Sequence, residues 1–230
     1  MKKFAFVLAF AMVSAITASA ATITPTDYAK KIEISLGSTA QTALGASTLT
    51  DFPVLVRLST GISGFTYADF QQTAGADLVF ADAENNALAF EIDTWNDQGE
   101  SLVWVKVPSL SASSKVYAYY GGSAYAHTAS DTWSAYAGVW HFNENSGTAY
   151  DATANTLHGT PSGSKAASMV SYANGAVGKA RVNFADKSYL SIPNYNSLGL
   201  GGTFTISGWF LANSVSGYPR LFSRKREHTA

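Results

Sequence analysis

The chain has 230 residues, of which 47% are hydrophobic and 13% aromatic, so it can bury the core of one large or two modest domains. Charged residues make up only 13% and the formal net charge is -1, so the chain has no basic field with which to hold nucleic acid or an anionic membrane. Cysteine is absent, which excludes disulfides, thiolate metal sites and a thiol nucleophile.

The first twenty residues have the pattern of a secretory signal peptide. Lys2 and Lys3 are followed by an apolar run over 4–16 and by the small residues of 18–20, which suit a cleavage site. The apolar run is shorter than the roughly 20 residues of a membrane span, and no second run follows. We therefore expect a chain that begins near Ala21, lacks a membrane span and is secreted, periplasmic or on the cell surface. An uncleaved anchor is the alternative.

Short strand-like runs follow, divided by turn residues. They are KKIEISL (30–36), FPVLVRL (52–58), DLVFA (77–81), ALAFEIDTW (87–95), SLVWVKV (101–107) and SKVYAYY (114–120). The only helical window of useful length is 67–72. This spacing predicts an antiparallel β-sandwich over residues 21–125.

The pattern then pauses and resumes. Residues 121–134 are small and polar, and we expect a linker over 126–136. The later runs are AGVWHFN (137–143), ARVNF (180–184), YLSI (189–192) and FTISGWF (204–210). The predicted fold is therefore all-β, with two antiparallel β-sandwiches, the second over residues 137–230.

The run FEIDTW carries two carboxylates beside a tryptophan. In a regular strand Phe90 and Ile92 point into the core, while Glu91, Asp93 and Trp95 point away from it. A two-residue turn at 98–99 would place Glu91 opposite Lys106 and Asp93 opposite Trp104. Glu91 is then explained by a cross-strand ion pair.

The same register predicts an aromatic surface on the outer side of the hairpin. Trp95 and Trp104 would form a platform on which sugar rings stack, with Asp93 beside them, and Trp140 is a further candidate. The alternative is that a loop or the second domain covers these rings.

The sequence predicts no catalytic motif. The Glu91 and Asp93 pair resembles the catalytic strand of laminarinase-type glycosidases, but that motif needs a further acid and residues 94–96 supply none. NGAVGKA (174–180) lacks the spacing of a phosphate loop, and the histidines form no metalloprotease pair. His141, in a strand-like run, is interpreted as a polar-face or satisfied core histidine.

The phrases of the first half occur in an order that resembles a known family. FPVLVRL, DLVFADAENNALAFEIDTW, ESLVWVKVPSL and KVYAYYGG together resemble a bacterial secreted domain of unknown function over residues 28–125. That domain commonly precedes lectin-like domains or lies in envelope proteins of the ExbB/TolQ type. The resemblance implies a β-sandwich in an envelope or surface setting and no particular reaction.

The second half resembles the start of a concanavalin A-like, laminin G-type jelly roll. The phrases that carry the resemblance are 138–160, 175–194 and GTFTISGWF (202–210). Some members bind calcium or glycans through rim loops, which implies a calcium site with oxygen ligands from Asn143, Glu144, Asp151 and Asn155. The alternative is that these side chains only shape turns.

The family is usually longer than residues 137–230, and SRKREHTA at the end is basic and lacks alternation. We therefore expect a fragment or a frameshifted product with an incomplete jelly roll. Edges such as FTISGWF would be left unpaired, which predicts poor solubility or pairing with another chain.

These observations predict a non-catalytic, secreted or envelope-exposed module that binds a glycan or another cell-surface polymer. The alternative is a structural or adhesion segment of a larger envelope protein without sugar specificity. A glycoside hydrolase is the third reading. Each rests on analogy of fold.

Overall fold

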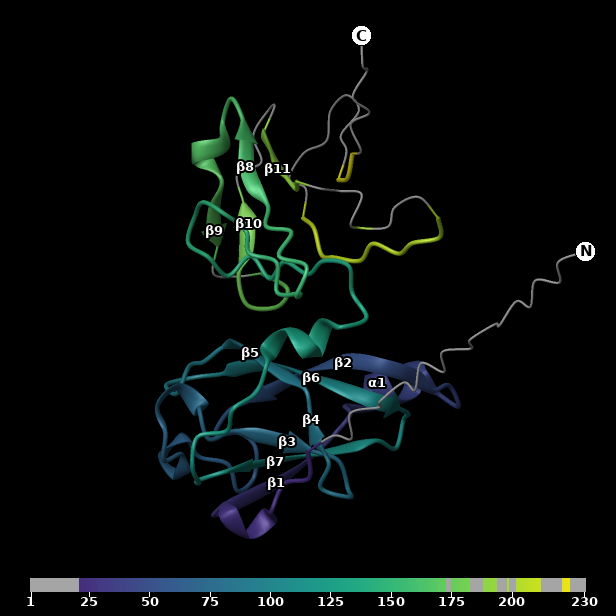
Figure 1. The fold of residues 1–230 in the computed structure, drawn as a ribbon, viewed down its shortest axis with the longest axis vertical. Coiled ribbons are helices and arrows are strands. Elements are labelled where there is room, and N and C mark those ends of the chain that lie inside the picture. Colours follow the sequence, from purple (N-terminus) through teal and green to yellow (C-terminus); the bar gives the residue numbers. More distant parts are fainter. Residues whose placement is uncertain are drawn as a thin grey trace, which may run out of the picture.

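The computed structural model describes residues 21–172, 175–182, 188–193, 198, 202–211 and 221–223. The expected signal peptide and residues 224–230 of the basic C-terminal run lie outside them. We name residues 21–125 the first part, 126–136 the connecting segment and 137 onward the second part. Figure 1 shows the first part as the lower body and the second part above it. No helix in the described ranges is long and apolar enough to cross a membrane.

The first part consists of two antiparallel sheets. Its strands are β1 (Lys30–Ser35), β2 (Leu49–Leu58), β3 (Val79–Ala81), β4 (Ala87–Leu88), β5 (Phe90–Thr94), β6 (Ser101–Leu110) and β7 (Lys115–Tyr120). One sheet has the order β1-β7-β3-β4 and the other β2-β6-β5. Every run expected in this half contains a strand, so the prediction of an all-β, antiparallel chain is confirmed.

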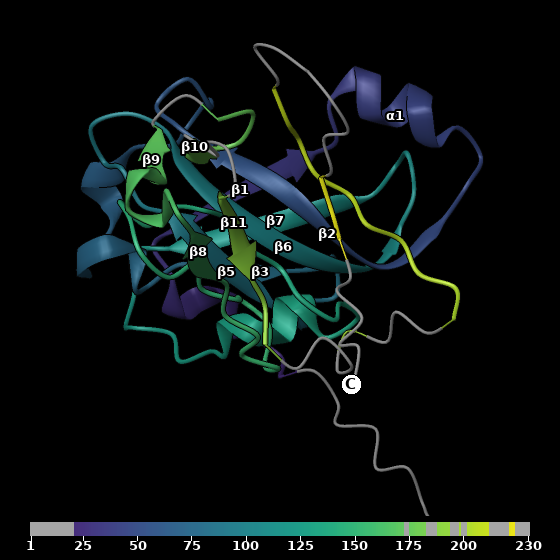
Figure 2. The ribbon, with the colours of Figure 1, turned by 90° about the horizontal axis from the view of Figure 1, so that it is seen from above.

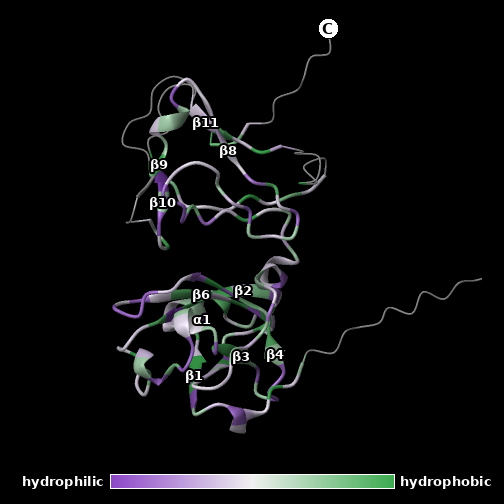
Figure 3. Cartoon of the chain, turned by 60° about the vertical axis from the view of Figure 1, so that its left-hand side comes forward, coloured by the Kyte–Doolittle hydropathy of each residue, from purple (hydrophilic) through white to green (hydrophobic). Residues whose placement is uncertain are grey.

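The two sheets enclose a common hydrophobic core. Alternate residues of β6, namely Val103, Val105 and Val107, point into it, as the pleat requires. Phe80 and Tyr120 approach from the opposite sheet and are fully buried. Figure 3 shows the strongly hydrophobic colouring gathered on strands of this body.

Helical segments are short. They are α1 (Ser38–Leu44), η1 (Pro25–Asp27), η2 (Tyr67–Asp69), η3 (Thr73–Gly75), η4 (Ala129–Trp133) and η5 (Ala166–Ser168). Only η2 falls in the expected helical window. Helix α1 was not predicted because its sequence, STAQTAL, has no large apolar stripe, and none of its residues is buried.

The second part contains short strand pairs. Strand β8 (Thr160–Gly163) pairs with β11 (Ser188–Ser191), and β9 (Val170–Tyr172) with β10 (Ala180–Val182). Seen along the long axis, these strands lie over the β2-β6-β5 sheet (Figure 2).

Two expected strands of the second part do not form. Residues 137–143 contain only an isolated bridge between Trp140 and Asp151. The run 204–210 has no strand partner, and its Trp209 is 84% exposed. Those two predictions are wrong: residues 137–143 have only that bridge and a backbone hydrogen bond from the N–H of Ala152 to the carbonyl of Val139, and 204–210 pair with no strand among the described residues. The predicted consequences for solubility and pairing remain predictions.

Candidate functional site

The register of the β5–β6 hairpin differs from the predicted one by two residues. Glu91 lies opposite Trp104, and Phe90 lies opposite Val105. A slip of two residues preserves the side of the sheet on which each residue lies. The turn is centred on residues 97–98 instead of 98–99: the N–H of Gly99 donates to the carbonyl of Asn96 at 3.2 Å, and Ser101 Oγ accepts the N–H of Asn96 at 2.9 Å. The expected pair of Glu91 with Lys106 is therefore wrong.

A β-bulge at Asp93 sends Trp95 to the core side. Ile92 pairs with Val103 and Thr94 with Leu102, so Asp93 is the extra residue. The Trp95 ring packs against the core, with ring centroids 4.9 Å from Phe70 and 5.3 Å from Tyr67. The prediction that Trp95 shares an outer surface with Trp104 is wrong for this reason.

Gly75 leaves the space that the Trp95 ring occupies. A methyl group added at Gly75 would lie 2.3 Å from the ring, and the residue has a φ of +71°. Both facts favour glycine at this position. The sequence of η3 thus accommodates the ring of a tryptophan that is partly buried against the core.

The connecting segment covers the outer side of the sheet. Its helix η4 lies across β5 and β6, between the two parts (Figure 1). Trp133 is 4% exposed, its ring centroid is 5.4 Å from that of Trp104, and its Nε1 donates a hydrogen bond to Glu91 Oε2. Lys106 Nζ donates to Ser134 Oγ at 2.9 Å. Within the segment expected as a linker, η4 therefore buries Thr132 and Trp133, while most of the other residues of 126–136 are exposed.

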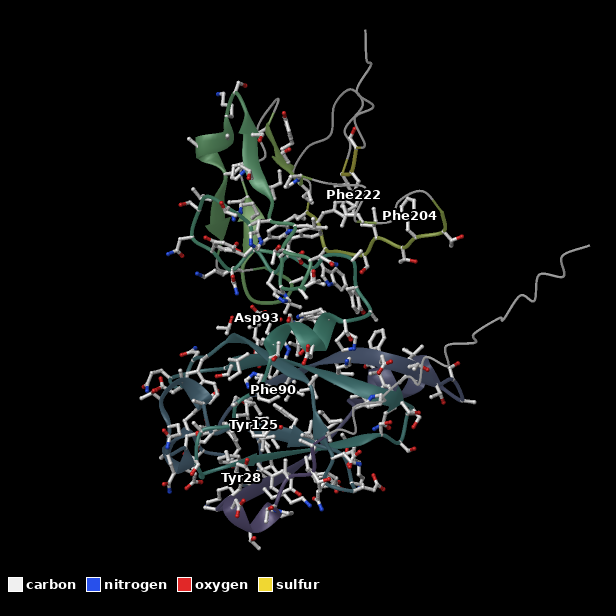
Figure 4. The ribbon with its side chains drawn as sticks, viewed as in Figure 1. Tyr28, Phe90, Asp93, Tyr125, Phe204 and Phe222 are labelled. Carbon is white, nitrogen blue, oxygen red and sulfur yellow. The ribbon has the colours of Figure 1, made fainter. Side chains whose placement is uncertain are left out.

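His141 of the second part lies between the two carboxylates of β5. Its Nε2 is 3.0 Å from Glu91 Oε2, and its Nδ1 is 4.0 Å from Asp93 Oδ2. The imidazole lies nearly parallel to the Trp104 ring, with centroids 6.0 Å apart. Figure 4 places Asp93 at the top of the lower body, next to the second part.

The surroundings of His141 favour its charged form. Burial alone would lower the pKa of His141, but the hydrogen bond with Glu91 and the charges of Asp93, Glu91 and Glu144 raise it above the ordinary value. The side chain of His141 is only 12% exposed. A protonated imidazole therefore has charged partners in a site that largely excludes water.

Two further contacts join the parts. Asn143 Nδ2 donates to Asp93 Oδ1 at 2.9 Å, and the Asn143 carbonyl is in turn held within the second part by Lys179 Nζ at 3.1 Å. A methyl group added at Gly178 would lie 3.3 Å from Leu102 Cδ1. Gly178, in the run rejected above as a phosphate loop, thus lies against the first part.

We call this set of residues the seam. It consists of Glu91, Asp93, Leu102 and Trp104 of the first part, Trp133 of the connecting segment, and His141, Asn143 and Gly178 of the second part. Two features of the sequence indicate the seam: Trp133 is a lone tryptophan within a polar segment, and His141 lies in a run that also carries Trp140.

Two of the residues expected to bind calcium, Asp151 and Asn155, make hydrogen bonds that organise loops. Asp151 accepts four hydrogen bonds of 2.8 to 3.0 Å, from the N–H groups of Val139, Thr153 and Leu157 and from the Thr153 hydroxyl. Asn155 Nδ2 donates to the carbonyl of Ala137. Such bonds are typical of carboxylates and amides that shape turns.

The other two members of the expected calcium-binding set also contact residues of the chain. Glu144 accepts a hydrogen bond from the N–H of Tyr150 at 2.7 Å and forms an ion pair with Arg181 at 3.2 Å. Asn143 belongs to the seam. Within the described ranges, no three His, Asp or Glu side chains form a group suited to a metal ion.

Of the four expected ligand-binding residues, the structure brings two together. Asp93 and Trp104 both lie beside His141 at the seam, whereas Trp95 packs against the core of the first part. Trp140 is half-buried within the second part, where its Nε1 donates to the carbonyl of Leu157 at 3.0 Å. No shared aromatic platform results.

Comparison with known proteins bears on the same region. Residues 74–157 match a family described as a domain of unknown function (DUF2341). A domain of unknown function was expected over residues 28–125, and the match supports that expectation where the two ranges overlap, over residues 74–125. Neither a curated protein nor a solved structure matches the chain. The matched range crosses the expected linker and includes every seam residue except Gly178.

Proposed function

We propose that the chain is a secreted or envelope-exposed structural module without catalytic activity, in which the first part is a base that holds the second part in a fixed orientation. The seam carries this proposal. The outer side of the β5–β6 hairpin, where a sugar was expected to stack, is occupied by Trp133 and His141 of the same chain. A surface already covered by its own chain serves to join parts.

The proposal includes two β-sandwiches, the second of the concanavalin A-like type, within a larger envelope protein. The enclosed core of the first part supports the first sandwich. The antiparallel pairs β8–β11 and β9–β10 are compatible with the second. The signal-peptide pattern of residues 1–20 and the low charged fraction of 13% support an extracytoplasmic setting.

The state of the two β5 carboxylates supports a non-catalytic role. A retaining glycosidase needs two carboxyl groups about 5 Å apart beneath a cleft that admits a sugar. The side chains of Glu91 and Asp93 are 17% and 5% exposed, and His141 covers both. Their partners belong to the chain itself, so they join parts rather than face a substrate.

Glycan binding is the second candidate, and exposed rings of the second part favour it. Tyr150 is 59% exposed, with the edge of its ring against His158 at 5.1 Å, and Tyr189 is 56% exposed. Exposed aromatic faces can stack on sugar rings. A lectin site would then lie in the second part and would not involve the seam.

The test is hydrogen exchange and thermal unfolding of the whole mature chain, residues 21–230. Glu91→Gln keeps the shape but removes the charge that His141 and Trp133 contact, whereas the matched control Glu84→Gln changes an exposed carboxylate away from the seam. We expect Glu91→Gln alone to increase exchange at residues 129–143 and to lower the melting temperature.

Two results would contradict the proposal. Equal exchange and melting in both variants would show that the seam does not join the parts. Binding on a glycan array that is lost in Tyr150→Ala and retained in Glu91→Gln would favour the second candidate instead.

A further inference from the structure

We propose that the seam is a pH-sensitive latch: a proton on His141 fastens the second part to the first, and loss of that proton loosens the contact. This inference rests on the proposed role of the seam in joining the parts. It states at which pH the seam holds the two parts together, a point that the proposed function does not address.

The geometry shows what protonation of His141 changes at the seam. A neutral imidazole has one N–H group and can donate to only one of two flanking carboxylates, whereas an imidazolium can donate from both nitrogens. His141 Nε2 lies 3.0 Å from Glu91 Oε2 and Nδ1 lies 4.0 Å from Asp93 Oδ2. Only the protonated ring can therefore attract both β5 carboxylates to the second part.

The groups that β5, β6 and η4 direct at the ring contain no cation. Strand β5 supplies Glu91 and Asp93, β6 supplies the Trp104 ring, and η4 supplies Trp133, whose N–H already binds Glu91. The nearest cation of β6, Lys106, is directed to Ser134. The first part and the connecting segment thus present two negative charges and two aromatic rings to His141.

The cations of the second part have other partners. Lys179 Nζ donates to the carbonyl of Asn143 and to Asn145 Oδ1, and Arg181 pairs with Glu144, the third carboxylate that acts on His141. Neither cation has a direct contact with Glu91 or Asp93 among those the structure shows. The imidazolium is thus the positive charge that the two partly buried carboxylates face.

The direction of the pH dependence follows from the environment of the ring. The carboxylates raise the pKa of His141 in the folded chain above its ordinary value of 6.5, although burial opposes them. A folded pKa above the unfolded one contributes stability that is fully present below the unfolded value and is lost as the pH rises through the folded value. The latch is therefore closed in mildly acidic solution and open in alkaline solution.

The experiment measures the pH dependence on the whole mature chain. The free energy of unfolding and the amide exchange of residues 129–143 are followed between about pH 5.5 and about pH 8.5, the range in which histidine titrates. Exchange is expressed at each pH relative to the intrinsic, base-catalysed rate of an unprotected amide. His141→Gln removes the titration, and His127→Gln is the matched control, because His127 is an exposed histidine outside the seam. We expect exchange to increase with pH in the wild type and His127→Gln, and this dependence to be lost in His141→Gln.

A second measurement does not depend on the stability of His141→Gln. The imidazole of His141 is titrated by NMR in the wild type and in Glu91→Gln, and we expect a lower pKa in the variant because a neighbouring negative charge is gone. An unchanged pKa in Glu91→Gln, or the same pH dependence of exchange in His141→Gln and the wild type, would overturn the latch.

The two proposals fail in different ways. If Glu91→Gln loosens residues 129–143 at every pH while the wild type shows no pH dependence, the seam joins the parts but is no latch. If neither Glu91→Gln nor His141→Gln changes exchange at any pH, the proposed joining role itself is wrong, and the latch with it.

Discussion

At the scale of single residues, the buried carboxylate of Asp77 holds the first part together where its loops meet. It is fully buried, and its Oδ2 accepts the N–H groups of Gln71, Gly121 and Gly122 at 2.8 to 3.3 Å. A methyl group added at Gly122 would lie 2.5 Å from the carbonyl oxygen of Asp27. Glycine at position 122 therefore allows the backbone after β7 to pass close to the backbone of Asp27.

We expect Asp77→Ala to lower the free energy of unfolding by about 3 kcal/mol or more, because three backbone N–H groups lose a charged acceptor in a buried site. Urea unfolding of the mature chain measures this change. The control Asp97→Ala alters an exposed carboxylate, for which we expect a change within about 0.5 kcal/mol. Similar losses in the two variants would contradict the structural role of Asp77.

At the scale of elements, the bulge in β5 decides which tryptophan is structural. Because Asp93 is the extra residue, Thr94 lies on the outer side and Trp95 packs on Phe70 and Tyr67. Trp95→Ala would leave a cavity in the first core, and we expect a loss of about 3 to 5 kcal/mol in the free energy of unfolding.

Chemical denaturation followed by far-UV circular dichroism measures the loss in Trp95→Ala. Trp209→Ala is the matched control, because the ring of Trp209 is 84% exposed and we expect almost no change. If Trp95→Ala kept wild-type stability but lost binding to a glycan, the original interpretation of Trp95 as a binding residue would be right.

The strands of the first part could be predicted from sequence because alternation of apolar and polar residues depends only on the pleat. The valines of β6 are an example, and they lie on the expected side. The bulge at Asp93 could not be predicted, because it depends on contacts with residues far along the chain, His141 and Asn143. Helix α1 escaped prediction because nothing in it is buried.

At the scale of the whole molecule, the candidate site lies between segments that the sequence pattern had separated. Glu91 and His141 are 50 residues apart, and the tryptophan between them belongs to the presumed linker. The periodicity of apolar residues predicts the strands. It does not predict that a distant segment of the chain will cover the outer face of a sheet. The carboxylates of FEIDTW were recognised, whereas their partners required the fold.

Gly178 offers a test of the packing between the parts. It has a φ of +58° and lies against Leu102, whereas Gly147 has a φ of +75° with no atom within 4 Å of an added methyl group. We expect alanine at either position to cost about 1 kcal/mol through backbone strain. Only Gly178→Ala should also increase amide exchange in the seam, because its methyl group pushes on the first part.

Hydrogen exchange by mass spectrometry separates the two effects. Equal exchange of residues 91–104 and 129–143 in Gly178→Ala and Gly147→Ala would mean that the loop of Gly178 does not bear on the first part.

The packing of η4 has a consequence for how such a domain can be transferred between genes. A recombination breakpoint at residue 125 would leave behind Trp133, and the new host protein would expose the ring of Trp104 beside an unpartnered Glu91. A breakpoint beyond His141 and Asn143 would carry the covering residues along. The family match over residues 74–157 likewise extends past η4, His141 and Asn143.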